Sequence, residues 1–283
     1  MAAFDDKPKI DSTVAHVARR YNYWLGGKDN YAADRASGDR IAKAYPQVVV
    51  DARANRKWMH RVVRCLVAEH GVTQFLDVGV SLPVEPNVHQ VAQGIDPAAR
   101  VVYVDNDPLV MVHARALLTS TPEGATGYAE VDMHDTARML AEAKDTLDFT
   151  RPVAVLFCAV LHFVDNDEQA YALVARTLES LPPGSYVAIS NFTLDGVGLW
   201  RRWQIKRLMK KLPPDGQIRP RSRRQFTNFF SGLEIAAPGV RLVSDWRVDL
   251  AEPHERPAKR AYVYGAVAKK VALLPAAERS PPV

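Results

Sequence analysis

From residue 73 onward, short apolar runs alternate with segments whose apolar residues recur at helical spacing. Such alternation is typical of a doubly wound, mostly parallel sheet joined by crossover helices. The runs predict strands at residues 74–78, 100–105, 127–131, 153–160, 185–191, 240–248 and 261–268. The intervening periodicity predicts helices at residues 87–93, 108–118, 136–144 and 168–180. We therefore expect an α/β fold with seven strands, the last two forming an antiparallel hairpin at the sheet edge.

Two helical regions accompany this pattern. Residues 11–70 show helical spacing on both sides of an aromatic, glycine-containing segment at residues 21–31. A basic helical stretch at residues 199–212 precedes the final hairpin. The expected organisation is an N-terminal helical extension, an α/β domain that includes a helical cap, and a flexible tail. Their expected limits are residues 1–70, 71–270 (with the cap at 196–232) and 271–283.

Carboxylates lie at the ends of three predicted parallel strands. Asp77 is followed by Gly79 after the first strand, Asp105 ends the second, and Asp132 follows the third. Because the carboxyl ends of parallel strands meet at one edge of a sheet, we expect these side chains in a single site. Each aspartate alone could instead cap the following helix, but the agreement of all three favours a ligand site.

The residue types at this edge suit a nucleoside without phosphates. Asp105 can accept hydrogen bonds from both ribose hydroxyls, and Asn106 can contact the adenine. Asp132 can accept from the adenine amino group, while Met133 can pack on the ring. A nicotinamide cofactor is disfavoured, because no Gly-x-Gly-x-x-Gly follows Asp77 and the loop offers no cradle for a pyrophosphate.

His162 is the first candidate for a catalytic base. It follows the fourth predicted strand, so it would emerge beside the same edge and could take a proton or orient a substrate. The alternative is a histidine that only satisfies hydrogen bonds near the strand end. Tyr21 is a second, weaker candidate, because the reference pKa of tyrosine is about 10.

Composition narrows the possible partners. The net charge is +5, with much of the excess in residues 199–224. The basic helix could be a solvated amphipathic helix over the sheet edge, a cap for an anionic substrate, or a nucleic-acid contact, which is the least favoured. Cys65 and Cys158 form no metal-binding cluster, and neither a signal peptide nor a long apolar run is evident. We expect a cytoplasmic protein without a metal or a membrane partner; the pattern does not indicate its oligomeric state.

The chain resembles the actinobacterial S-adenosyl methyltransferase family, long known as a domain of unknown function, over about residues 12–270. The resemblance rests on residues 18–31, 87–93, 101–108, 159–163, 229–234 and 245–247. It implies a class I, Rossmann-like methyltransferase that transfers the methyl group of S-adenosylmethionine to a small-molecule acceptor.

The resemblance also implies that the aromatic segment folds over the cofactor as a lid. Tyr21, Gly26, Gly27 and Lys28 would approach the methionine moiety, and Lys28 would meet its carboxylate. Leu161, in the matched segment after the fourth strand, would also contact the cofactor. The alternative for the aromatic segment is a rigid packing clasp between the helices and the sheet.

One departure from the family pattern affects the ligand loop. Family members commonly carry a second glycine and a Pro-Thr pair where residues 81–86 read Ser-Leu-Pro-Val-Glu-Pro. Ser81 adds a Cβ where close backbone approach is expected, and Glu85 adds negative charge near the carboxylate of the ligand. The alternatives are therefore a regulatory or scaffold protein that binds S-adenosylmethionine or S-adenosylhomocysteine without methyl transfer, or a non-methylating use of the cofactor.

Overall fold

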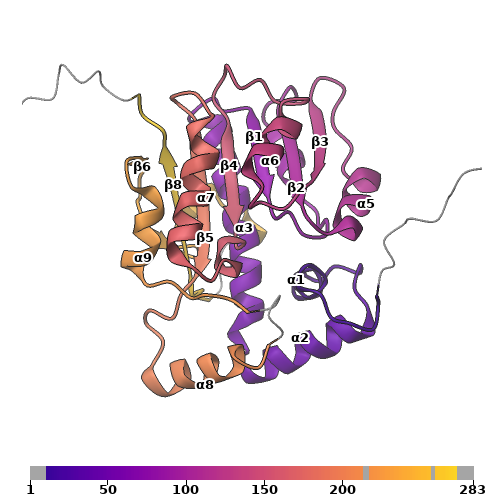
Figure 1. The fold of residues 1–283 in the computed structure, drawn as a ribbon, viewed down its shortest axis with the longest axis vertical. Coiled ribbons are helices and arrows are strands. Elements are labelled where there is room, and N and C mark those ends of the chain that lie inside the picture. Colours follow the sequence, from indigo (N-terminus) through magenta and orange to yellow (C-terminus); the bar gives the residue numbers. More distant parts are fainter. Residues whose placement is uncertain (1–10, 213–216, 256–258, 273–283) are drawn as a thin grey trace, which may run out of the picture.

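The computed structural model describes residues 11–212, 217–255 and 259–272. Within these residues the central sheet has eight strands in the order β3-β2-β1-β4-β5-β8-β6, and β7 also pairs with β8 (Figure 1). The strands are β1 (Gln74–Val78), β2 (Arg100–Asp105), β3 (Ala125–Glu130), β4 (Ala154–Cys158), β5 (Tyr186–Phe192), β6 (Glu234–Ile235), β7 (Arg241–Leu242) and β8 (Val263–Lys269). Strands β1 to β5 pair in parallel, whereas β8 is antiparallel to its neighbours.

Helices cover both faces of the sheet. They are α1 (Val17–Leu25), α2 (Ala32–Ala44), α3 (Gln47–Ala68), α4 (Val88–Gln93), α5 (Pro108–Leu117), α6 (Thr136–Ala143), α7 (Asp167–Glu179), α8 (Leu199–Met209) and α9 (Arg223–Thr227). Successive strand residues point to opposite faces, so Phe75 packs with α3, α4 and α5, while Leu76 packs with α6 and α7. The predicted α/β class with a mostly parallel, doubly wound sheet is confirmed.

The predicted count of seven strands needs correction, whereas the antiparallel pairing of the last two segments is confirmed over a shorter length. Of residues 240–248 only β7 is a strand; it pairs antiparallel with β8 at the edge of the sheet, where the additional short strand β6 also pairs with β8. The buried Arg61 of α3 explains the short β7: its Nε donates to the Trp246 carbonyl at 2.9 Å and its Nη2 to the Val243 carbonyl at 2.5 Å. Because a side chain satisfies these carbonyls, the segment needs no neighbouring strand there. The other predicted strands agree with the structure to within two residues at each end.

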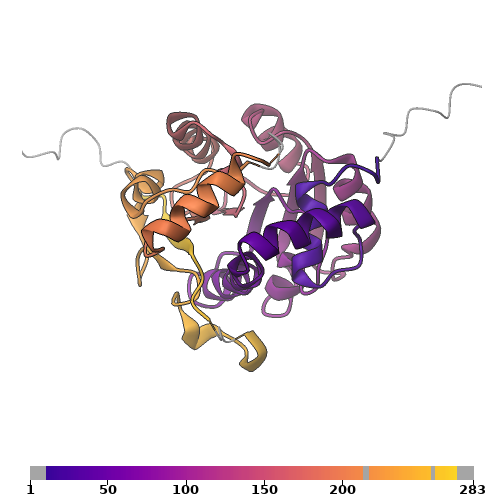
Figure 2. The same cartoon turned by 90° about the horizontal axis from the view of Figure 1, so that it is seen from below.

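Three helices lie across the end of the sheet at which the parallel strands finish. They are α1, α2 and α8, and the view from below shows α8 and α2 side by side (Figure 2). Buried Asp34 joins the first two of these helices, because it accepts from the backbone N–H groups of His16 and Tyr31 and pairs with Arg19. The long helix α3 connects this layer to the core beside the sheet.

Two of the expected domain limits can be compared with the structure. Residues 47–68 of the predicted N-terminal extension share a hydrophobic core with the sheet, so the division at residue 70 stays a prediction. Residues 273–283, which make up most of the predicted tail, lie outside the described residues. Among the described helices, none has the length and apolar character that crossing a membrane requires.

Candidate functional site

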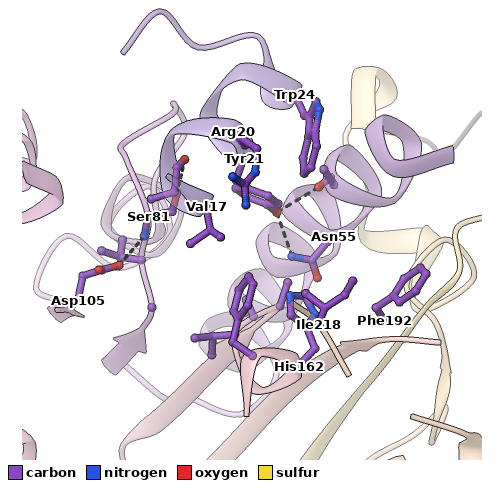
Figure 3. Close-up of a pocket in the computed structure, with 18 of the residues that line it drawn as sticks. Val17, Arg20, Tyr21, Trp24, Asn55, Ser81, Asp105, His162, Phe192 and Ile218 are labelled. Carbon is purple, nitrogen blue, oxygen red and sulfur yellow. Dashed lines mark hydrogen bonds between the residues drawn. The ribbon is translucent and has the colours of Figure 1, made fainter. Parts of the chain in front are cut away.

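A cavity of about 450 Å³ opens at the carboxyl ends of the parallel strands, beneath α1, α2 and α8 (Figure 3). Its volume lies in the range of small-molecule sites. The structure brings together most of the site residues that the sequence predicted. Those that line the cavity are Tyr21, Asp77, Gly79, Asp105, Asn106, Asp132, Met133 and His162.

Four other predicted residues do not line this cavity. Gly26 ends α1 with a φ of 90°, and the N–H of Gly27 donates to the Asn22 carbonyl at 2.9 Å. Lys28 is exposed, and Leu161 is buried in the core that faces α6 and α7. The structure thus gives the glycines a local backbone role, and contact of these four residues with a cofactor stays a prediction.

Asp77 lies near the end of β1, and Gly79 forms the turn that follows it. Burial raises the pKa of Asp77 to about 7, against the opposing charge of Arg56 and with a further increase from Asp105. A cation bound beside this carboxyl would favour its charged form. Gly79 has a φ of 75°, and a Cβ there would lie 2.4 Å from Cγ2 of Val160. Only glycine therefore allows this turn and this close approach.

Asp105 holds the loop that follows β1. Its Oδ2 accepts from the N–H of Ser81 at 3.1 Å, and its Oδ1 accepts from the N–H of Asp107 at 3.0 Å. Ser81 adopts a φ of 63°, the left-handed conformation that a glycine would favour, and its hydroxyl donates to the Ala18 carbonyl of α1 at 3.1 Å (Figure 3). The extra side chain at residue 81 thus connects the loop to α1. Glu85 is exposed and does not line the cavity.

Polar side chains continue toward β3. Oδ1 of Asp132 accepts from the N–H of His134 at 2.8 Å and lies 2.7 Å from its Nδ1. Nδ2 of Asn106 lies 3.5 Å from Oδ2 of Asp132. Met133 lines the cavity beside them. This end of the cavity therefore combines hydrogen-bonding groups with a polarisable thioether.

The two candidate bases differ in their surroundings. Tyr21 donates to the Ala52 carbonyl at 3.2 Å and accepts from Nδ2 of Asn55 at 3.1 Å, and burial raises its pKa to about 12. Burial, helped by Arg221, lowers the pKa of His162 to about 3, and its Nδ1 has no partner among the described residues. At neutral pH these groups are therefore a phenol and a neutral imidazole.

Arginines are the main feature that the sequence reasoning missed. Arg20 of α1 and Arg56 of α3 both line the cavity and are largely buried. Nη2 of Arg56 donates to the Pro86 carbonyl at 3.0 Å and to Oδ1 of Asn87 at 2.9 Å, while its Nε has no partner in the described chain. Helical spacing could have pointed to Arg20, because Val17, Tyr21 and Trp24 lie on the same helix face and also line the cavity.

The strand order, the antiparallel strand beside β5 and the aspartates at the parallel strand ends define a protein with the class I methyltransferase fold. The family model of the S-adenosyl methyltransferases matches residues 4–271, and the chain belongs to this family. It is therefore assigned as a methyltransferase whose cofactor is S-adenosylmethionine, as the sequence predicted. This family match does not favour the alternatives in which the protein binds the cofactor without transferring its methyl group.

Two solved structures are similar over almost the whole chain. A DUF574 family protein from Streptomyces avermitilis is 42% identical, with 93% of this chain and 100% of that chain covered and a TM-score of 0.85. A candidate methyltransferase from Thermobifida fusca is 32% identical, with 95% and 100% covered and a TM-score of 0.80. Among curated proteins, no sequence matches.

Proposed function

We propose that S-adenosylmethionine lies across the ends of β1, β2 and β3, where this protein uses it to methylate a small molecule. The ribose would meet Asp105, the adenine would lie between Asp132 and Met133, and the ammonium group of the methionine part would meet Asp77. The main support for this proposal is that these carboxylates converge beside the turn at Gly79, where there is no room for a Cβ. No pyrophosphate cradle is needed for such a ligand.

Arg20 and Arg56 are the proposed partners of the methionine carboxylate. Both belong to the cavity wall, and the charge of Arg56 reaches Asp77. A guanidinium binds a carboxylate well because it can donate two parallel hydrogen bonds. Gly26, Gly27 and Lys28 follow directly after the helix that carries Arg20 and Tyr21, so in this proposal they act by fixing the position of the lid. Leu161 would support the wall beneath His162.

The chain's main contribution to methyl transfer would be alignment and exclusion of water. The cofactor supplies a methyl group activated by a sulfonium. A neutral His162 can accept a hydrogen bond from the acceptor and so orient it, while Tyr21 is committed to Ala52 and would shape the wall. Replacing His162 with Gln should lower turnover and leave the affinity for S-adenosylhomocysteine unchanged. Unchanged turnover on an acceptor of the wild-type protein would exclude this role.

Calorimetry tests the cofactor proposal directly. S-adenosylmethionine and S-adenosylhomocysteine should each bind at one site per chain, whereas ATP and NAD should give no saturable heat, because the loop after β1 lacks a phosphate cradle. Absence of heat with both S-adenosyl compounds, or equally tight binding of ATP, would contradict the proposal. Transfer of a labelled methyl group then distinguishes an enzyme from a protein that only binds.

We also propose that the protein acts in the cytoplasm of an actinobacterium. Cys65 and Cys158 are free thiols, as is usual in a reducing compartment. The Streptomyces and Thermobifida relatives support the origin. Fractionation of the native host, with the protein detected by antibody, would test the location.

A further inference from the structure

The cavity extends well beyond the part assigned to the cofactor. Its wall includes Asp132 after β3 at one end and Val263 of β8 at the other. Five strand spacings separate β3 from β8, and at about 4.8 Å per spacing this is about 24 Å. The proposed cofactor position covers β1, β2 and β3. The half in front of β5 and β8, called here the acceptor chamber, remains for a second molecule.

The basic helix α8 forms one wall of the acceptor chamber with an apolar face. Ile205, Leu208 and Met209 line the cavity, followed by Leu212 just after the helix, at spacings of three, four and seven residues from the first. The lysines and arginines of this segment do not line the cavity: Arg201, Lys206, Arg207, Lys210 and Lys211 are exposed, and the half-buried Arg202 donates to the Leu194 carbonyl at 2.9 Å. The second half of the helix thus gives the chamber an apolar wall, while the exposed surface of α8 carries its charges together with Leu199, Trp200 and Trp203.

The opposite walls are also apolar. Ile41 of α2 and Val48 of α3 line the cavity, together with Phe192 at the end of β5. Tyr45 packs edge-on against Phe192 with a ring separation of 5.8 Å. Figure 3 shows Phe192 and Ile218 on the side of the cavity opposite Ser81 and Asp105. The polar cofactor half and the acceptor chamber are therefore distinct in chemistry as well as in position.

The polar groups of the acceptor chamber are already paired with one another. Oδ2 of Asp51 accepts from the Tyr45 hydroxyl at 2.7 Å, and its Oδ1 accepts from the N–H of Tyr262 at 2.8 Å. Asn55 accepts from the Ser190 hydroxyl at 2.5 Å and donates to Tyr21. An anionic ligand would lose its hydration without gaining an opposite charge from these groups, and such a loss is costly. A cationic ligand would have to compete for Asp51, whose oxygens already accept the hydrogen bonds of Tyr45 and Tyr262.

We propose that the acceptor is an uncharged, largely apolar small molecule held between α2, α3 and α8. This inference rests on the proposed function and specifies its substrate class. The nucleophilic atom of the acceptor would point toward the junction of the two halves, where His162 lines the cavity. That atom forms the bond to the methyl carbon, the carbon–sulfur bond breaks with its electron pair left on sulfur, and the acceptor's proton leaves to water while His162 orients the acceptor.

A matched pair of ligands tests the acceptor class. The fluorescent 2-naphthol is neutral at neutral pH, while 2-naphthoate has the same ring system and a negative charge. Each is titrated into the full chain, with and without saturating S-adenosylhomocysteine. We expect 2-naphthol to bind about tenfold more tightly than 2-naphthoate, because a buried carboxylate without a partner is unfavourable.

Two variants of α8 separate its inner and outer faces. Leu208→Glu places a charge in the acceptor chamber and should weaken 2-naphthol binding by about tenfold or more. Lys206→Glu changes charge on the exposed face and should leave this affinity unchanged. Circular dichroism and the affinity for S-adenosylhomocysteine show whether each variant is folded. Leu208→Ala, which adds no charge, is the second variant if Leu208→Glu does not fold, and should weaken binding less.

Several outcomes would overturn the proposal. If 2-naphthoate binds more tightly than 2-naphthol, and Lys206→Glu loses this binding, the acceptor is anionic and is held by the basic residues. Failure of both naphthalenes to bind while S-adenosylhomocysteine binds would reject the acceptor chamber and leave the proposed cofactor site intact. Failure of S-adenosylhomocysteine alone would reject the cofactor site, and 2-naphthol binding would still report on the chamber.

Discussion

The two halves of the cavity are built in different ways. In the cofactor half, the key side chains follow β1, β2 and β3, and backbone N–H groups hold Asp105 in place. In the acceptor chamber, most of the wall comes from side chains on α2, α3 and α8. A parallel sheet is a rigid support for a ligand common to many enzymes, whereas helices laid over its end can change without disturbing it. The difference suggests that the cofactor half determines the chemistry and the helices determine the acceptor.

The largest expected effect comes from removing the ribose partner. Asp105→Ala should weaken S-adenosylhomocysteine binding by about a hundredfold, because two charge-assisted hydrogen bonds contribute about 1.5 kcal/mol each. Calorimetry measures the loss. Glu123→Ala, an exposed carboxylate outside the cavity, is the matched control and should bind as the wild type does. Since Asp105 also holds Ser81, Asp105→Asn provides a milder variant, and a change of less than threefold in both would contradict the cofactor assignment.

The next prediction compares how two cationic side chains of the N-terminal segment, Arg20 and Lys28, contribute to ligand affinity. Arg20→Ala should weaken S-adenosylhomocysteine binding by about tenfold, the value of one hydrogen bond between charged groups. Lys28→Ala should change it by less than about twofold, because Lys28 is exposed and does not line the cavity. Arg20→Lys keeps the charge and should retain part of the affinity. A larger loss of affinity in Lys28→Ala than in Arg20→Ala would show that Lys28, and not Arg20, binds the carboxylate of the ligand.

Binding in the cofactor half should also depend on pH. The pKa of Asp77 is raised to about 7, so below this pH its carboxyl is protonated in the free protein and must lose a proton to bind an ammonium group. Affinity for S-adenosylhomocysteine should rise with pH up to about 7 and then level off, with a slope of up to about tenfold per pH unit below it. Binding of neutral 2-naphthol should not follow this curve.

Asp77→Asn is the control for this pH effect. It should bind more weakly at neutral pH and lose most of the slope, because the amide has no proton to release. Any slope left would be assigned to Asp105, whose pKa burial also raises. A wild-type affinity that stays constant as the pH falls would exclude Asp77 as the ammonium partner.

The smallest effect concerns the connection between the loop after β1 and helix α1 at Ser81. Ser81→Ala should lower the free energy of unfolding by about 1 kcal/mol, because it removes the hydrogen bond to Ala18 and keeps the left-handed backbone. Ser81→Gly removes the same bond but relieves a backbone cost of about 1 kcal/mol, so the two effects should nearly cancel. Denaturant titration measures both. Equal losses in the two variants would show that backbone conformation is unimportant there.

Much of the cofactor half could be predicted from the sequence. Apolar runs that end at Asp77 and Asp105, and the run followed by Asp132, are local signals, and parallel strands bring such ends to one edge whatever the details of packing. The strand β7 could not be predicted correctly, since residues 240–248 are apolar enough for a strand. The carbonyls of Val243 and Trp246, which follow β7, are satisfied by Arg61, and Arg61 is far away in the sequence.

The acceptor chamber depended on the tertiary structure. Residues 17–24, 48–59 and 205–212 each show the spacing of an ordinary amphipathic helix, and such a face can pack against a core or border a cavity. The sequence by itself determined the fold class, the cofactor edge and its carboxylates, because these follow from residues close together along the chain. Only packing decided that the three helix faces meet around one space and that Arg20 lines it while Lys28 is exposed, because those positions depend on how distant helices lie across the sheet.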